Sequence, residues 1–227
     1  MLIKNGCSIK LWLTGNLLMI ETEKLSFKYN ESDFAIQLEN LKVNEGEKLC
    51  IHGPSGTGKS TIMKLLSGEL VGRAEKLTIC GEQILQLSEN SRASFRLNNL
   101  GLIFQTPSLI DWMTIEQNLY LPLPKVNSEV KQKTQELLQH AKLENSQKLK
   151  PSQLSVGEQQ RIAVIRALLP GHPLILADEP TANLDEENRQ LVFDLILAHS
   201  STLLYISHNE KEINQFEYKL NSKDWCK

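Results

Sequence analysis

Polar and hydrophobic residues alternate in two stretches near the start of the chain, at residues 20–27 and 34–43. This period of two is typical of strands that bury one face and expose the other. Two such strands in succession predict an antiparallel edge layer. Later in the chain, the run at 174–177 is continuously apolar and the run at 202–206 is nearly so. Such runs favour parallel strands that are covered on both faces.

Apolar residues at helical spacing separate these strands. Residues 59–67 have this spacing, and they follow a short apolar strand predicted at 48–52. Residues 129–143 are charged and helix-prone, and residues 158–169 predict a helix that ends before a Pro-Gly pair. A helix predicted at 188–199 completes a parallel strand–helix–strand unit with the two apolar runs.

A glycine-rich segment joins the strand at 48–52 to the helix at 59–67. Its glycines let the backbone curl so that successive N–H groups point at phosphate oxygens, and the following helix adds its positive N-terminal end. Lys59 would neutralise charge on the β- and γ-phosphates, and the Ser60 hydroxyl would bind Mg²⁺. The alternative, a glycine-rich turn with a solvated lysine, fits poorly between a strand and a helix. The predicted nucleotide-binding residues are Gly53, Pro54, Ser55, Gly56, Thr57, Gly58, Lys59, Ser60 and Thr61.

Two adjacent acids, Asp178 and Glu179, follow the apolar run at 174–177. The carboxyl end of a buried parallel strand delivers side chains to the crevice where open α/β sheets bind ligands. We expect Asp178 to bind Mg²⁺ and Glu179 to polarise the attacking water, since adjacent residues at a strand end point in different directions. Capping of a strand-to-loop turn is the alternative, and the phosphate-binding loop disfavours it. The fold predicted is α/β: a P-loop NTPase core with a mostly parallel sheet, an antiparallel β edge layer and an inserted helical subdomain at about residues 106–168.

Composition limits the classes of function. The chain has 227 residues, of which 41% are hydrophobic, with a formal charge of -2 and a pI near 6.2. It therefore has no global basic field to support a nucleic-acid partner, and none is expected. No segment approaches the roughly 18 uncharged apolar residues of a membrane span. The four cysteines lie far apart without metal-ligand spacing, so free thiols are favoured, and Cys50 fits a small buried hydrophobe.

The segment at 1–18 differs from the rest of the chain. Lys4 and Lys10 flank short apolar pieces, but the apolar core and the small-residue cleavage site of a signal peptide are missing. We interpret residues 1–18 as a dispensable N-terminal extension, with Met19 as an alternative start. A single nucleotide-binding domain at residues 19–227 follows.

From residue 19 onward, the chain resembles the nucleotide-binding subunit of ATP-binding cassette (ABC) transporters. The motifs that carry the resemblance stand in one fixed order. They are the phosphate loop 53–60, Gln105, Leu154-Ser155-Val156-Gly157-Glu158-Gln159-Gln160-Arg161, Asp178-Glu179, Leu184-Asp185 and His208. The segment that begins at Leu154 is specific to this family, because other phosphate-loop proteins lack it.

The resemblance implies a head-to-tail pair of cassettes, a homodimer or a heterodimer, in which Ser155 of one chain closes over ATP held by the other. Ser155 can donate its hydroxyl, and Gly157 can bring a backbone N–H close to a phosphate at the positive start of the next helix. Val156 replaces the usual glycine. Glu158 replaces the usual glutamine and brings negative charge near the nucleotide, so affinity or rate is expected to differ. An ordinary Ser-capped helix is the alternative for this segment.

The resemblance also assigns roles to single residues. Gln105 is implied to bind Mg²⁺ and the reactive water, and His208 to contact the γ-phosphate and the catalytic Glu179; these three form the implied catalytic set. Tyr29 is implied to stack on adenine, although its pattern fits core or edge packing equally well. Asp185 is implied to contact the partner cassette. Helix capping is the alternative for Asp185, and both roles are compatible.

Two segments indicate a particular group within the family. They resemble segments of the lipoprotein-releasing and macrolide-exporter ATPases, and they are Pro180-Thr181-Ala182-Asn183-Leu184-Asp185 and Asn118-Leu119-Tyr120-Leu121-Pro122-Leu123. This resemblance implies an ATPase that uses ATP and Mg²⁺ to drive a separate integral membrane permease. It also implies that the ATPase is a peripheral protein on the cytoplasmic face of the cell membrane. Residues 107–113 are a candidate surface for that permease, and subdomain packing explains them nearly as well.

Two alternatives to a transport ATPase stay open. One is a soluble cassette ATPase that acts on nucleic acid or ribosomes, whose usual tandem cassettes and basic insertions are not visible in this sequence. The other is a regulatory ATP-binding module that hydrolyses ATP poorly, an alternative that Val156 and Glu158 raise.

Overall fold

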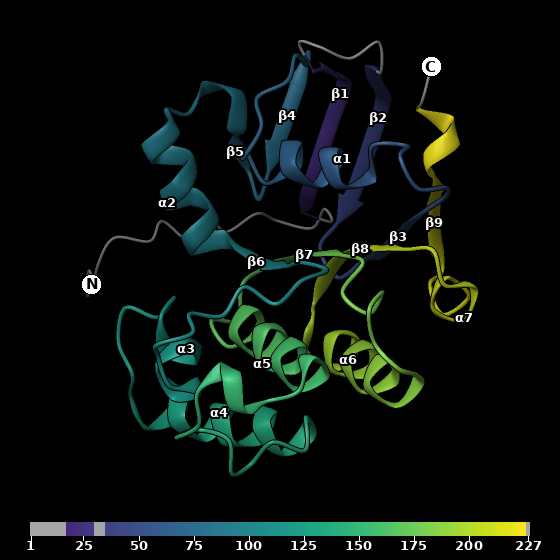
Figure 1. Cartoon of the computed structure of the whole chain (residues 1–227). Coiled ribbons are helices and arrows are strands. Elements are labelled where there is room, and N and C mark those ends of the chain that lie inside the picture. The colour runs from purple at the N-terminus through teal and green to yellow at the C-terminus, as the bar shows by residue number, and fades with distance from the viewer. Residues whose placement is uncertain (1–16, 30–34, 226–227) are drawn as a thin grey trace, which may run out of the picture.

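The computed structural model describes residues 17–29 and 35–225. Two sheets and seven α-helices make up this part of the chain (Figure 1). The smaller sheet is antiparallel, with the strand order β2-β1-β4-β5. The larger sheet has the order β6-β7-β8-β3-β9, and all its neighbouring strands are parallel. The predicted α/β architecture is confirmed.

The elements have the following bounds. The antiparallel sheet consists of β1 (Leu18–Lys28), β2 (Ala35–Asn44), β4 (Lys76–Ile79) and β5 (Glu82–Gln83). The parallel sheet consists of β3 (Lys48–His52), β6 (Leu100–Ile103), β7 (Leu174–Asp178), β8 (Thr202–Ser207) and β9 (Tyr218–Asn221). The helices are α1 (Lys59–Leu66), α2 (Glu89–Asn99), α3 (Ile115–Tyr120), α4 (Ser128–His140), α5 (Val156–Leu168), α6 (Glu186–His199) and α7 (Glu210–Ile213). Three 3-10 turns lie at Ile84–Gln86, Pro151–Gln153 and Ser222–Asp224.

The strands and helices predicted from the hydrophobic pattern are present, with bounds that differ by a few residues. Elements that the pattern did not predict are short or mostly polar. The helix α2, for example, buries only Phe95, and β5 has two residues, both exposed. One buried position leaves no periodicity to detect, because a pattern needs several apolar residues at regular spacing.

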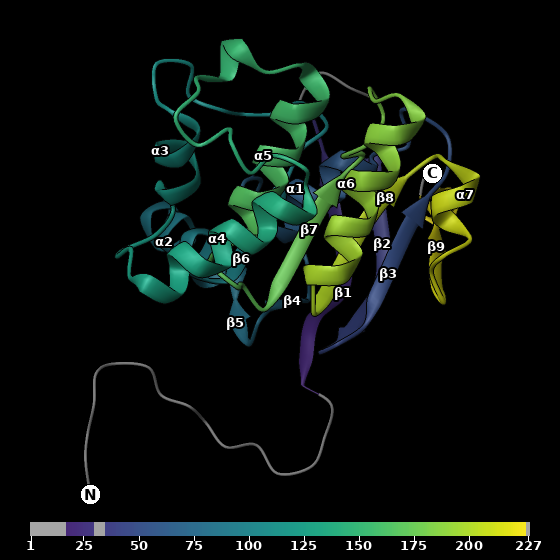
Figure 2. The ribbon, with the colours of Figure 1, turned by 90° about the horizontal axis from the view of Figure 1, so that it is seen from below.

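Alternate residues of the parallel strands face two different cores. In β7, Leu174 and Leu176 pack with α1 and the antiparallel sheet, whereas Ile175 and Ala177 pack with helices α3 to α6. Figure 2 shows α5 and α6 in front of β7 and β8 on this second face. Because both faces are covered, residues 174–177 of β7 and 203–206 of β8 are all buried hydrophobic residues, as predicted, and the polar residues lie at the strand ends.

The parallel direction of the strands gathers the candidate residues at one edge of the sheet. The phosphate loop follows β3, Gln105 lies two residues after β6, Asp178 ends β7 and His208 follows β8. All four strands run the same way, so their carboxyl ends meet at the edge where ligands of open α/β sheets bind.

Helices α3, α4 and α5 lie between β6 and β7, inside the predicted helical subdomain. The helix α5 packs on the parallel sheet as well as on α3 and α4, and all three helices share one core cluster with that sheet. The packing is therefore continuous from this insertion to the sheet.

The predicted extension at 1–18 lies mostly outside the described residues. The strand β1 begins at Leu18, and the Leu17 carbonyl accepts a hydrogen bond from the Glu45 N–H at 2.8 Å. These two residues therefore join the fold ahead of the predicted start at 19. Cys50 is fully buried, as predicted, and its burial raises the pKa of its thiol to about 12.

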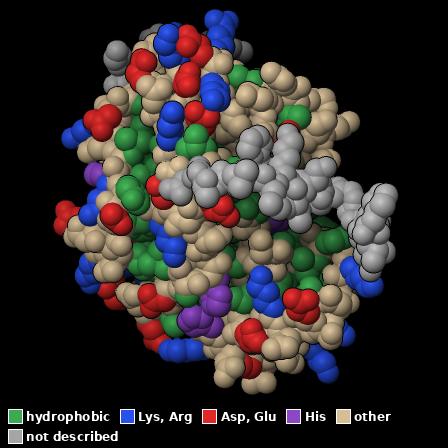
Figure 3. Space-filling view, turned by 180° about the vertical axis from the view of Figure 1, so that it is seen from behind, with side chains coloured by type: hydrophobic (Ala, Val, Ile, Leu, Met, Phe, Trp, Pro, Cys, Tyr) green, Lys and Arg blue, Asp and Glu red, His purple; other side chains and the backbone are tan. Residues whose placement is uncertain are grey.

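Two surface properties bear on the expected partners. No helix within residues 17–29 and 35–225 is both long and apolar enough to cross a membrane. On the face drawn in Figure 3, acidic and basic side chains are interspersed with hydrophobic ones rather than separated into large patches.

Candidate functional site

The glycine-rich loop has the curled backbone that its sequence predicts. Gly53, Gly56 and Gly58 have φ values of 140°, 80° and 83°, in the region that glycine enters without steric cost. Gly58 is the N-cap residue of α1, and the first turn of that helix carries no acidic residue. The positive end of α1 therefore faces the loop without a neutralising side chain of its own.

The end of the described chain supports this loop from outside. A Cβ atom on Gly53 would lie 2.1 Å from Oγ of Ser222, so only glycine fits there. The Thr57 hydroxyl donates to Ser222 Oγ at 2.6 Å, and Nε1 of Trp225 donates to the Thr57 carbonyl at 3.0 Å. Trp225 is buried. Neither Ser222 nor Trp225 belongs to a sequence motif, so neither was predicted.

Lys59 is buried, with 5% of its side chain exposed. Its Nζ donates to the carbonyls of Gly53 at 3.0 Å and Pro54 at 2.9 Å, and it lies 3.6 Å from Oε1 of Glu179. The ammonium group is thus held between the loop and the acid that follows β7. It adds a fixed positive charge to the backbone cradle, which suits a polyphosphate ligand.

Asp178 and Ser60 form the part of the site that suits a divalent cation. Burial raises the pKa of the Asp178 carboxyl, and a hydrogen bond from Ser60 partly opposes this rise. The Oδ1 atom of Asp178 is buried without a hydrogen-bond partner in the described structure. A buried carboxylate oxygen with an open lone pair beside a serine hydroxyl fits Mg²⁺, which prefers oxygen ligands.

Glu179 is held from both sides. Its Oε2 lies 3.3 Å from Nδ1 of His208, and its backbone N–H donates to the Ile206 carbonyl at 3.1 Å. The φ of Glu179 is 44°, a value uncommon for residues other than glycine and often found at functional sites. With Lys59 at its Oε1, the Glu179 side chain lies between a lysine and a histidine at the edge of the sheet.

An open cavity of about 490 Å³ collects most of the predicted residues. It is lined by Tyr29, Ser55, Gly56, Gly58, Lys59, Ser60, Thr61, Gln105 and Glu179. Gln105 is exposed and reaches this cavity from the carboxyl end of β6. Tyr29 is 42% exposed; its ring packs edge-on against Phe27, with ring centroids 4.8 Å apart, and its hydroxyl lies 3.3 Å from Thr61 Oγ1. The stacking role of Tyr29 stays a prediction.

The structure does not bring the segment at Ser155 to this cavity. Ser155 is the N-cap residue of α5, and it shares a capping box with Glu158. The Ser155 hydroxyl donates to Glu158 Oε2 at 2.7 Å, an interaction that lowers the pKa of Glu158. Helix capping, the alternative given above, is therefore real, and a nucleotide contact stays a prediction.

Gly157 is required by the packing of α5 against α6. A Cβ atom on it would lie 2.6 Å from Cγ of Asn188. The Asn188 side chain in turn donates to Asp185 Oδ2 at 2.6 Å, and Asp185 caps α6. Capping by Asp185 is thus present, as the alternative expected, and its contact with a partner cassette stays a prediction.

Gln160 connects α5 to two loops of the site, and no role was predicted for it. It is buried, and its Nε2 donates to the carbonyls of Phe104 at 2.8 Å and Pro180 at 2.9 Å. These carbonyls lie next to Gln105 and Glu179, so Gln160 ties the start of α5 to both catalytic candidates. Gln160 belongs to the segment that begins at Leu154, and this position in a family motif could have indicated its importance.

A comparison with known families identifies this arrangement. The family model described as "ABC transporter" matches residues 37–182. The chain belongs to the ABC transporter family. Within that family it is an ATP-binding, ATP-hydrolysing subunit, because the match covers the phosphate loop, the segment at Ser155 and the two acids. An ABC ATPase unrelated to transport is not favoured.

Curated relatives and solved structures agree with this assignment. The ABC subunit is 38% identical over 179 residues to the ABC transporter ATP-binding protein YtrE of Bacillus subtilis, covering 76% of this chain and 78% of YtrE. It is 36% identical over 190 residues to the lipoprotein-releasing system ATP-binding protein LolD of Treponema denticola, covering 80% of this chain and 84% of that one. Among solved structures, the ATP-binding cassette MJ0796, in a dimeric post-hydrolysis state with ADP and Pi, matches with a TM-score of 0.77 and 28% identity. That match covers 89% of this chain and 94% of MJ0796.

Proposed function

We propose that this ABC subunit works as a pair of cassettes that enclose two ATP molecules and drive a separate integral membrane permease of the lipoprotein-release or macrolide-export type. It would act on the cytoplasmic face of the cell membrane. The observation that carries the proposal is the cavity that joins the phosphate loop, Gln105 and Glu179, while Ser155 lies at the start of a helix outside it. Such a half-site needs a second chain to supply the missing serine.

The loop and Lys59 would grip the triphosphate. Residues 55, 56 and 58–61, from the loop and the start of α1, line one side of the cavity. Their N–H groups would bind phosphate oxygens, and Lys59 adds the charge that a polyphosphate needs. Tyr29 would stack on the adenine ring, since its exposed ring lines the same cavity. Its hydroxyl contact with Thr61 ties that ring to α1, which follows the loop.

Ser60, Asp178 and Gln105 would hold Mg²⁺. When bound, this ion would balance charge on the phosphates. The buried, unpaired Oδ1 of Asp178 supports this assignment, because a carboxylate oxygen without a partner loses free energy unless a cation or donor reaches it.

Glu179 would accept the proton of the attacking water as a general base. His208 on one side and Lys59 on the other restrict its carboxylate, so the base is already oriented before the nucleophile arrives. His208, with 56% of its side chain exposed, is free to donate to the γ-phosphate. Gln105, from a different strand, would orient the same water.

The dimer follows from the position of Ser155. MJ0796, a similar cassette, has been solved as a dimer with ADP and Pi, which supports the same association here. ATP held by one chain and covered by Ser155 of the other would add attraction only in the ATP state. Hydrolysis would remove that attraction and open the pair of cassettes. This opening is the motion that would drive the permease.

The dimer is tested with Glu179→Gln, which binds ATP without the general base. With ATP and Mg²⁺, this variant should run at twice the monomer mass on size-exclusion chromatography with light scattering. Glu179→Gln combined with Lys59→Ala is the matched control and should stay monomeric. A Glu179→Gln monomer at saturating ATP, alone and with its co-expressed membrane partner, would contradict the pairing.

The transport role is tested by copurification. The tagged subunit, extracted from native membranes in detergent, should bring down an integral membrane permease, and that permease should raise the rate of phosphate release. The relatives named lipoprotein-releasing ATPases support a permease of that type. Recovery of ribosomes or nucleic acid instead, with no permease, would reject the transport role.

A further inference from the structure

We propose that Glu212 is a positioning residue for ATP hydrolysis: its carboxyl group fastens the loop that carries His208 to the loop that follows Glu179. This inference rests on the function proposed above. Glu212 belongs to α7, beyond every motif that carries the family resemblance, and 3% of it is exposed.

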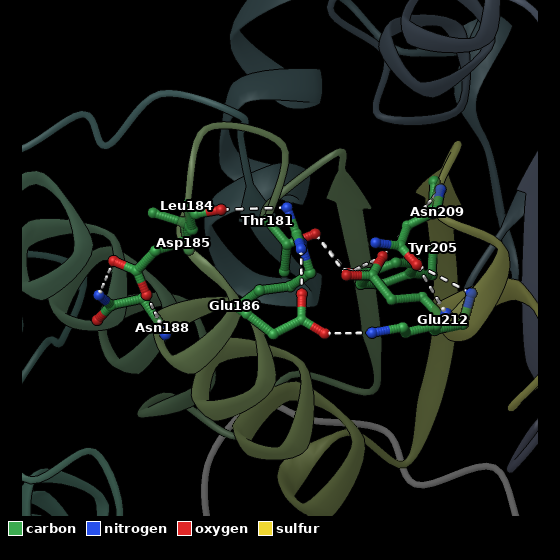
Figure 4. Close-up of polar contacts among 11 residues, drawn as sticks. Thr181, Leu184, Asp185, Glu186, Asn188, Tyr205, Asn209 and Glu212 are labelled. Atoms are coloured by element: carbon green, nitrogen blue, oxygen red, sulfur yellow. Dashed lines mark hydrogen bonds and ion pairs between the residues drawn. The ribbon is translucent and has the colours of Figure 1, made fainter.

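Three hydroxyl groups converge on the Glu212 carboxyl group (Figure 4). The Thr181 hydroxyl donates to Oε1 at 2.7 Å. The Ser207 hydroxyl donates to Oε2 at 2.6 Å, and the Tyr205 hydroxyl donates to the same oxygen at 3.1 Å. Burial raises the pKa of Tyr205 well above its usual range, which keeps its hydroxyl protonated as a donor.

The hydroxyl donors come from the two segments that carry Glu179 and His208. Ser207 is the residue before His208, and its hydroxyl oxygen also accepts from the Asn209 N–H at 3.0 Å. Thr181 lies two residues after Glu179, in the loop that leads to α6. One carboxyl group therefore spans both sides of the Glu179–His208 contact, and the relative position of these two loops sets that contact.

A second tie joins the same segments at the surface. Nζ of Lys211, next to Glu212 in α7, donates to Oε1 of Glu186 in the first turn of α6 at 2.5 Å. This exposed ion pair is worth little free energy by itself. Two adjacent residues of α7 therefore contact the segment after β7. Glu212 does so in the interior, through Thr181, and Lys211 does so at the surface, through Glu186.

Burial of the Glu212 carboxyl group costs free energy. No ion pair with Glu212 exists within residues 17–29 and 35–225, and buried carboxyl groups without a cation cost free energy. Its partner Tyr205 packs its ring against Phe193 and Phe216 in an apolar core. Replacing the whole network by hydrophobic residues would be neutral or stabilising, whereas replacing Glu212 alone leaves its three hydroxyl donors without their acceptor. The place of the network, between the loops that carry Glu179 and His208, points to positioning.

The test compares Glu212→Leu, which removes the acceptor of all three hydroxyl groups, with Glu212→Gln, which keeps a hydrogen-bonding group of the same shape. We expect Glu212→Leu to lower kcat for ATP about tenfold through misplacement of His208. Its KM should stay close to that of the wild type, and its thermal midpoint should fall by a few degrees, because three buried hydroxyl groups lose their acceptor. Glu212→Gln should recover most of kcat. Glu210→Gln, an exposed acid on the same helix, is the matched control and should leave kcat unchanged.

A double-mutant cycle with His208→Ala separates positioning from general damage. If Glu212 acts through His208, adding Glu212→Leu to His208→Ala should cost about twofold or less, because the two effects are not additive. Thr181→Val, which removes one tie without changing volume, should reproduce part of the loss even if the leucine variant folds poorly.

The results that overturn the proposal differ from those that overturn the proposed function. Unchanged kcat in the folded Glu212 and Thr181 variants, or fully additive losses with His208→Ala, would reject Glu212 as a positioning residue. If kcat falls in step with the thermal midpoint across these variants, and Glu212→Gln does not recover kcat, Glu212 has a role in folding only. Failure of the proposed function shows instead in the unmodified subunit, as an absence of ATP-dependent pairing and permease binding.

Discussion

The Oε2 atom of Glu179 lies 3.3 Å from the Nδ1 atom of His208. These residues follow neighbouring parallel strands, β7 and β8, whose register pairs Asp178 with Ile206. The register of the sheet therefore brings Glu179 and His208 side by side, and the hydrogen bonds of Glu212 fasten the loops that carry them. The proposed general base, Glu179, is therefore oriented before the nucleophile arrives.

His208→Ala should lower kcat for ATP hydrolysis about 100-fold, the lower end of what a positioned acid–base group contributes. ATP affinity should fall much less than kcat, because the phosphate loop and Lys59 supply most of the proposed phosphate contacts. Phosphate release gives kcat, and a fluorescent ATP analogue gives the affinity. His140→Ala, far along α4, is the control. Unchanged kcat in His208→Ala would show that the contact with Glu179 has no role in the reaction.

Asp178→Asn should stabilise the fold while it abolishes hydrolysis. Because burial raises the pKa of Asp178 in the folded state, the folded protein holds this proton to a higher pH than the unfolded chain does. Unfolding free energy of the wild type therefore falls as pH rises through that interval. The asparagine variant lacks this fall, so its thermal midpoint should be higher than that of the wild type at pH 7, by about 2–4 °C for each kcal/mol of unfolding free energy. The difference should vanish below about pH 4, the ordinary pKa of an aspartate.

Thermal scans over pH without nucleotide measure this difference. ATP with Mg²⁺ should then stabilise the wild type more than the variant, which reverses the order of the two midpoints. A lower midpoint for Asp178→Asn at pH 7 without nucleotide would mean that its carboxylate has a structural partner.

Trp225→Phe should weaken ATP binding about fivefold, because it removes a hydrogen bond worth about 1 kcal/mol from the Thr57 carbonyl. The phenyl ring keeps most of the buried apolar contact, so the fold should persist. Isothermal titration with ATP measures the change. Trp112→Phe is the matched control, since Trp112 is 76% exposed. Equal affinities for both variants would show that the loop holds its shape without this support.

Glu158→Gln should tighten the ATP-dependent dimer about threefold to tenfold by removing a negative charge near the triphosphate of the facing chain. Glutamine can still accept from the Ser155 N–H, so the helix cap is kept. Sedimentation of both proteins in the Glu179→Gln background measures the dimer constants. The gain should shrink at high salt, and Glu144→Gln, an exposed acid elsewhere, should have no effect. An unchanged dimer constant would place Glu158 away from the nucleotide.

The sequence predicted the parts of the fold and site that regular patterns encode. The continuous apolar runs that became β7 and β8, and the glycines before Lys59, each have one physical explanation that sequence spacing reveals. The cavity then follows, because parallel strands bring their carboxyl ends to one edge. The roles assigned to individual residues stay predictions.

What the sequence did not reveal depends on contacts between distant segments. Ser222 and Trp225 support the phosphate loop from more than 160 positions away, as the sequence separations of 165 and 168 show. Glu212 finds its three donors only after β7 and β8 are paired. The capping box of Ser155 was written in the sequence, whereas the fit of Gly157 against Asn188 needed the packing of two helices.

The most direct measurement of the central claim mixes two inactive variants. Lys59→Ala cannot grip ATP, and Ser155→Arg cannot close over it, so each homodimer lacks both composite sites. In a head-to-tail heterodimer, the intact loop of one chain meets the intact Ser155 of the other. Random pairing should therefore restore up to about a quarter of the wild-type rate of phosphate release. A mixture no more active than its separate components would contradict the claim that ATP is enclosed between two chains.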